Sequence, residues 1–195
     1  MGFLDALMGR TKLPKSNEDK IFAMSTGLLT LQTAADLEPS NRIGIVFRSL
    51  PTGRFQQLNK DTVEMLQLQD QTDPTDELKV QLKVHQVKDD IGFQWLVVEG
   101  QDFQSLLAAI HAVAMGLLDE GLGDCLLAAV FPFQGNGRAV YWIYGYKEAT
   151  FYPFVPSGGR RRDNAEEIRL AGIAREDLPV EPDLERWYPL WGVPV

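Results

Sequence analysis

Two stretches in the middle of the chain carry the hydrophobic pattern of neighbouring β-strands. Apolar and polar residues alternate along residues 78–84, as they do in a strand with one buried face. Residues 93–98 are mostly apolar, and the four residues 89–92 between the two stretches, Asp-Asp-Ile-Gly, are typical of a turn. The pattern therefore predicts a β-hairpin.

The strongest helical pattern begins at Asp102. This residue suits an N-cap, and the apolar residues that follow it recur at the three- and four-residue spacing of one helix face. Gly121 lies just beyond the last of them and marks the end of the helix. A less regular spacing predicts helices over residues 17–37, with a break at Gly27, and over residues 55–66.

Short apolar runs predict the remaining strands, over residues 43–47, 126–133, 139–146 and 150–155. The Gly-Asn-Gly sequence at residues 135–137 is a turn that joins two of them into a hairpin. The resulting order of elements is β-α-β-β-α-β-β-β. It predicts an α+β fold in which helices pack on a largely antiparallel sheet, and this order also resembles, as an analogy only, that of the chaperones related to type III secretion.

The last third of the chain has a different character. Asn164 with Glu167 resembles a capping box that opens a short helix over residues 165–171. From residue 178 onward, repeated prolines restrict regular structure while large aromatic residues supply apolar area. We expect this tail to wrap the domain and cover a face or an edge of the sheet; a surface that a partner protein covers is the alternative.

These features divide the chain into three parts. Residues 1–15 form a short amphipathic segment, residues 16–156 an α+β domain, and residues 157–195 a basic loop, a short helix and a Pro/aromatic tail packed on the domain. The acidic polar residues 69–77 inside the domain are expected to form a solvated loop.

Composition narrows the class of protein. The chain has 195 residues, of which 45% are hydrophobic and 24% charged, and this suits one globular domain. Its 27 acidic residues exceed its 19 basic ones, for a net charge of −8, so we expect no nucleic-acid partner. The apolar run at residues 106–118 is too short to span a bilayer, and residues 1–10 lack the apolar core of a signal peptide.

Candidate catalytic residues are few. The single cysteine, Cys125, cannot form an internal disulfide and fits a reducing cytoplasm. It could serve as a nucleophile only with His85 or His111 as its base, and a buried inert thiol is the favoured interpretation. Neither histidine has a second ligand at the spacing of a zinc pair, so we predict no metal and no cofactor.

The arginines Arg160, Arg161 and Arg162 form a candidate anion- or nucleotide-binding loop. They follow two glycines and precede a predicted helix N-terminus, so cationic charge and free backbone N–H groups would face the same ligand. Local pairing with the neighbouring acidic residues 163, 166 and 167 is the simpler interpretation.

The chain resembles a known family most closely in its last third. Residues 150–156 (TFYPFVP), 162–165 (RDNA) and 178–192 (LPVEPDLERWYPLWG) look like the signature stretches of the PspA-associated protein family PspAB. Residues 1–10 and 92–99 are similar to it as well, so the resemblance extends over essentially the whole chain.

The resemblance implies an accessory component of a phage-shock-type envelope-stress module. Such a protein would work near PspA, a coiled-coil protein that remodels or supports the inner membrane. The family is not characterised as an enzyme, and the resemblance transfers no catalytic residue to this chain. We therefore expect a non-enzymatic, cytoplasmic interaction protein; its oligomeric state stays open.

Two groups of apolar residues are candidates for an interaction surface. The aromatic group in the tail consists of Trp187, Tyr188 and Trp191. The N-terminal group lies on one face of a two-turn helix and is followed by cations, the ingredients of a weak interfacial membrane anchor; it consists of Phe3, Leu4, Leu7 and Met8. Docking of the N-terminal segment on its own domain is the alternative to membrane contact.

Overall fold

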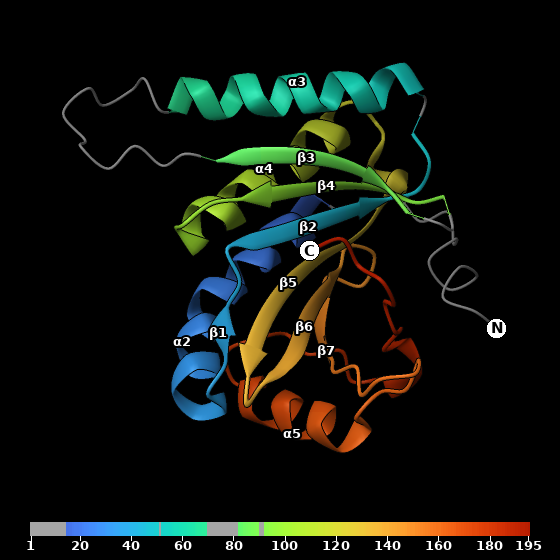
Figure 1. Ribbon diagram of the computed structural model, residues 1–195. Coiled ribbons are helices and arrows are strands. Elements are labelled where there is room, and N and C mark those ends of the chain that lie inside the picture. Colours follow the sequence, from blue (N-terminus) through green and yellow to red (C-terminus); the bar gives the residue numbers. More distant parts are fainter. Residues whose placement is uncertain (1–14, 51, 70–81, 90–91) are drawn as a thin grey trace.

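The computed structural model describes residues 15–50, 52–69, 82–89 and 92–195. Its central element is an antiparallel sheet in which the strands follow the order β3-β4-β2-β5-β6-β7, with β1 paired to β5 at one end (Figure 1). The strands are β1 (Glu38–Pro39), β2 (Arg42–Phe47), β3 (Lys83–Lys88), β4 (Gln94–Glu99), β5 (Leu126–Gly135), β6 (Arg138–Gly145) and β7 (Thr150–Phe154).

Helices precede, connect and follow these strands. They are the 3₁₀-helix η1 (Lys15–Phe22), α2 (Ala23–Ala35), α3 (Thr52–Gln69), α4 (Phe103–Asp119), the 3₁₀-helix η2 (Gly123–Cys125), α5 (Asn164–Ala174) and the 3₁₀-helix η3 (Leu184–Arg186). Together with the antiparallel sheet they confirm the predicted α+β class. None of the described helices is both long enough and apolar enough to span a membrane.

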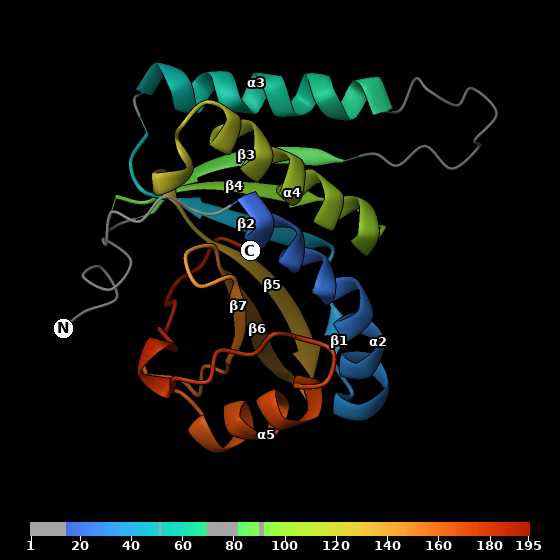
Figure 2. The same cartoon turned by 180° about the vertical axis from the view of Figure 1, so that it is seen from behind.

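The sheet has a buried core on each face. One core lies under α2 and α4, which cover the same face in Figures 1 and 2, and includes Leu31, Ile110 and Phe131. The opposite face carries a second core that includes Val130 and Ile143. Because neighbouring residues of β5 and β6 enter different cores, both strands read as nearly continuous apolar runs.

Local sequence signals explain several element boundaries. The side chain of Asp102 caps α4 by accepting a hydrogen bond from the backbone N–H of Ser105 at 2.7 Å, as predicted. The β5–β6 turn has positive φ angles at Asn136 (51°) and Gly137 (71°), the geometry of a type I′ hairpin turn that this dipeptide favours.

Two predicted elements differ from the structure. Strand β3 occupies Lys83–Lys88, whereas the alternating pattern placed a strand at residues 78–84; of these, residues 78–81 lie outside the described part. Pairing with β4, which sets Val84 opposite Val98, decides the position of β3. Gly27 does not break α2, which is continuous through this position. A glycine is needed here because a Cβ would lie only 2.5 Å from the Leu178 side chain.

The predicted capping box of α5 is also wrong. Asp163, and not Asn164, is the N-cap, and its side chain accepts a hydrogen bond from the N–H of Glu166 at 3.1 Å. Glu167 does not reach back to the cap, because its carboxylate is buried under the tail, where it accepts hydrogen bonds from the N–H of Val155 and from Arg162.

The hairpin tip between β5 and β6 packs closely on the turn that follows α2. A Cβ on Gly135 would overlap the Leu37 side chain and lie 2.8 Å from the backbone oxygen of Asp36. We therefore expect Gly135→Ala to lower the free energy of unfolding by about 1–3 kcal/mol, as measured by urea denaturation.

A matched control is available in α4. A Cβ on Gly116 would meet nothing within 4 Å, so Gly116→Ala should raise the free energy of unfolding by about 0.5–1 kcal/mol through helix propensity. Equal effects of the two substitutions would contradict the close approach at Gly135.

Candidate functional site

The C-terminal tail lies on the sheet face opposite α2 and α4. Trp187 and Leu190 are 6% and 8% exposed and belong to the second core. The chain end reaches the middle of the sheet (Figure 1), where a Cβ on Gly44 of β2 would come within 2.6 Å of the Val195 side chain. The tail therefore contributes to the apolar layer on this face of the sheet, together with Ala171 of α5.

Glu181 connects the start of the tail to β7 through hydrogen bonds. Its backbone N–H donates to the oxygen of Phe151, and its carboxylate accepts a hydrogen bond from the Thr150 hydroxyl at 2.8 Å. Its backbone oxygen accepts from the indole N–H of Trp187 at 3.0 Å. Because the indole N–H of Trp187 has this partner, the Trp187 side chain can be buried without leaving a polar atom unpaired.

The three aromatic residues predicted as an interaction surface differ in accessibility. Trp187 is buried, with its ring stacked on Tyr152 at 6.5 Å between ring centroids. Tyr188 is half-buried. Trp191 is 36% exposed and meets Phe154 edge to face, so Trp191 is the most accessible of the three.

The half-buried Arg162 pairs with the buried carboxylate of Glu167 beneath the tail. Its Nε lies 2.8 Å from the carboxylate of Glu167, its Nη1 donates to the backbone oxygen of Trp187, and its guanidinium lies over the Phe154 ring. Burial raises the pKa of Glu167, while the N–H of Val155 and Arg162 act against this. Arg162 therefore joins α5, β7 and the tail.

The other two arginines of the predicted anion-binding loop are not part of this ion pair. Arg160 and Arg161 are exposed, and Arg160 has a positive φ of 55°. The structure thus brings Arg162 under the tail and leaves Arg160 and Arg161 at the surface. A shared site for one anion would require Arg162 to give up Glu167.

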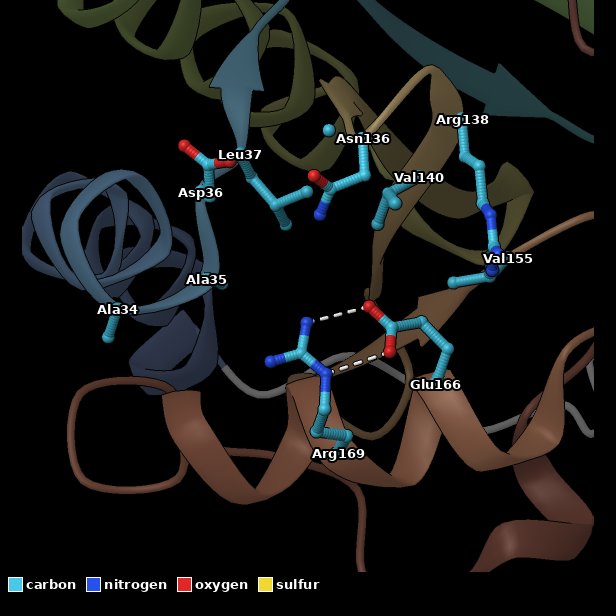
Figure 3. A pocket seen from close by; sticks show the side chains of 11 residues that line it. Ala34, Ala35, Asp36, Leu37, Asn136, Arg138, Val140, Val155, Glu166 and Arg169 are labelled. Atoms are coloured by element: carbon cyan, nitrogen blue, oxygen red, sulfur yellow. Dashed lines mark hydrogen bonds and ion pairs between the residues drawn. The ribbon is translucent and has the colours of Figure 1, made fainter.

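A separate recess of about 500 Å³ lies where α5 approaches the β5–β6 turn and the end of α2 (Figure 3). We call it the α5 recess. Its floor is apolar and buried, and its rim is polar. The floor includes Ala35, Leu37, Val140 and Val155; the rim includes Asp36, Asn136, Arg138, Glu166 and Arg169.

Two ion pairs fix the charged side chains of the α5 recess. Arg169 holds Glu166 through two hydrogen bonds of 2.7 Å each, and Arg138 lies 3.1 Å from the carboxylate of Asp163. The bond to Arg169 lowers the pKa of Glu166, and Arg138 contributes to the same shift. Glu166 is therefore ionised and locally neutralised at neutral pH.

Sequence reasoning did not identify the α5 recess. Its rim residues come from α2, the β5–β6 turn and α5, which are far apart along the chain. In the sequence, Asn136 has only the character of a turn residue. Arg138, Glu166 and Arg169 carry no motif, so only the packing of α5 beside the hairpin could have revealed the site.

The residues considered for catalysis lie elsewhere. Burial raises the pKa of the Cys125 thiol, and the charged groups that act on it are Arg48 and Asp124, with neither histidine among them. A thiol that stays protonated is a weak nucleophile. Within the described ranges, no group of three or more His, Cys, Asp or Glu residues is placed to hold a metal ion.

The two histidines have separate surroundings. His111 lies against the ring of Phe22, with its Nε2 3.8 Å from the carboxylate of Asp19, and burial lowers the pKa of His111. His85 is exposed on β3, with Nε2 3.7 Å from Glu99. The apolar N-terminal residues Phe3, Leu4, Leu7 and Met8 lie outside the described residues.

Comparison with known proteins identifies the family. A search of curated proteins gave no match, and a search of solved structures gave none either. A family model described as PspAB, PspA associated protein B, matches residues 1–195. Because this match covers the α+β domain and the Pro/aromatic tail together, the chain belongs to the PspAB family and is a member of a PspA-related module.

Proposed function

We propose that this protein is a non-enzymatic accessory component that binds a PspA-type protein of an envelope-stress module. The match of the PspAB family model to the whole chain carries the proposal, since the family is named for its association with PspA. The raised pKa of the Cys125 thiol speaks against the alternative of a cysteine-dependent enzyme. The pairing of Arg162 with Glu167 speaks against an anion site formed by all three loop arginines.

The proposal places the protein in the cytoplasm and assigns its action to protein–protein contact. Exposed apolar side chains available for such contact include Leu29 on α2, Ile168 on α5 and Trp191 in the tail. Single exposed apolar residues are common on monomers, so these side chains are compatible with a contact but do not locate it. Contact of residues 1–10 with the inner membrane is a further part of the proposal.

The test is direct binding between two purified proteins. The full chain is immobilised, and the PspA-type protein encoded in the same genome is passed over it, with an unrelated coiled-coil protein as the control. We expect a dissociation constant of about 1–10 µM or tighter. A response no larger than that of the control protein at about 100 µM would overturn the proposed function.

A further inference from the structure

The α5 recess is built on closely packed residues of the core. The four apolar floor residues are each at most 4% exposed, and all four belong to the core under α2 and α4. They are Ala35, Leu37, Val140 and Val155. Side chains packed in this way cannot rearrange at low cost. A ligand would therefore meet a preformed site and would not have to order it.

Two side chains at the rim carry unused hydrogen-bond donors. Arg169 engages Glu166 through Nε and Nη2, which leaves Nη1 without a partner among the described residues. The amide of Asn136 points into the recess in Figure 3 and is likewise without a partner within the described part of the chain. Both groups come from elements that the fold holds in place.

The cations are also more accessible than the acids that pair with them. The Arg169 side chain is 46% exposed against 26% for Glu166, and the Arg138 side chain is 61% exposed against 30% for Asp163. Within each of these two pairs the guanidinium group is thus the more exposed member, while the exposed carboxylate of Asp36 also lies at the rim. The carboxylates hold each guanidinium in a fixed orientation, which reduces the entropy lost when it binds an anion.

From these observations we infer that the α5 recess binds the carboxylate of an acidic side chain presented by a partner protein. The Asn136 amide and the free edge of Arg169 would donate to this carboxylate, and Arg138 would add positive charge beside it. The identity of the partner rests on the proposed function, but the carboxylate chemistry does not.

The first test uses a peptide and does not require PspA. Acetyl-Ala-Glu-Ala-amide is titrated into the full chain while the ¹⁵N–¹H signals of the arginine side chains and of the Asn136 amide are recorded. We expect saturable shifts at Arg169 and Asn136, with half-saturation at about 1–10 mM, and none at Arg160 or Arg161. The matched peptide with Gln in place of Glu should bind at least about fivefold more weakly.

Two variants assign the binding to the recess. Asn136→Gly removes the amide but keeps the left-handed backbone conformation, and Arg169→Met removes the guanidinium. Each should weaken the Glu peptide about fivefold to tenfold, whereas Arg161→Met should leave its affinity within about twofold. Melting curves of the variants establish that they are folded.

The outcomes separate this inference from the proposed function. Unsaturable shifts, equal binding of the Gln peptide, or equal or stronger shifts with inorganic phosphate at the same ionic strength would overturn the carboxylate assignment. If the PspA-type protein binds and Asn136→Gly and Arg169→Met leave that binding unchanged, its contact lies elsewhere and the partner assignment of the recess is wrong. If the peptide binds as expected and the PspA-type protein does not, the recess inference stands and the proposed function fails.

Discussion

Replacement of Arg162 by methionine is expected to lower the free energy of unfolding by about 3–5 kcal/mol. Arg162 neutralises Glu167, whose side chain is only 2% exposed, and also donates to the backbone oxygen of Trp187. Methionine fills a similar volume but leaves Glu167 as a buried charge without its cation. Thermal unfolding followed by circular dichroism should show a melting temperature roughly 10 °C lower.

The loss should depend on pH. Burial already raises the pKa of Glu167, and removal of Arg162 raises it further. Since a raised pKa in the folded state favours the protonated form, stability is lost as pH rises through that pKa. The difference between the variant and the parent should therefore be largest near neutral pH and shrink as the pH is lowered and Glu167 takes up a proton.

Arg161→Met is the control for this experiment. Arg161 is exposed, so its replacement should change the free energy of unfolding by no more than about 0.5 kcal/mol. If both variants melted like the parent at neutral pH, the ion pair beneath the tail would contribute nothing to stability.

Deletion of residues 184–195 should have an effect at least as large. It removes Trp187 and Leu190 from the second core and uncovers the sheet residues Val46, Val130 and Ile143. Loss of Trp187 alone, as in Trp187→Ala, is expected to cost about 3–5 kcal/mol, and the deletion should exceed that value. Urea denaturation of the parent, of Trp187→Ala and of the deletion variant gives the three free energies of unfolding to be compared.

Trp191→Ala separates burial from aromatic character in this test. Trp191 keeps 36% of its surface exposed, so its loss should cost about 1 kcal/mol or less. A deletion variant with the melting curve and sheet content of the parent would contradict the role of the tail as a covering layer. Its aromatic surface would then be available to a partner protein.

Much of the fold could be predicted because its signals are local. The cap at Asp102, the helical spacing after it and the Asn136–Gly137 turn each depend on residues that are close together in the chain, and each is evident in the sequence. Strand β2 was equally clear from its apolar run. Elements of this kind, placed in order along the chain, were sufficient to predict the α+β class.

Other features depended on contacts between distant segments. The sequence predicts a helix break at Gly27, but this glycine allows the close approach of Leu178 to α2. The spacing of Asn164 and Glu167 predicts a capping box, but Glu167 instead accepts hydrogen bonds from Arg162, which also donates to the backbone oxygen of Trp187 in the tail. A short-range motif cannot reveal whether a carboxylate turns toward its own helix end or toward an arginine under another segment.

Three properties could be read from the chain alone: the order of the longer helices and strands, the absence of a disulfide within the chain and, through residues such as 178–192, the resemblance to the PspAB family. Contacts between distant segments set which arginine pairs with Glu167 beneath the tail, which tryptophan stays accessible and where the α5 recess forms. The physical reason is that burial and ion pairing are set by neighbours in space. Here those neighbours come from α2, the β5–β6 hairpin, α5 and the tail, which meet only in the folded chain.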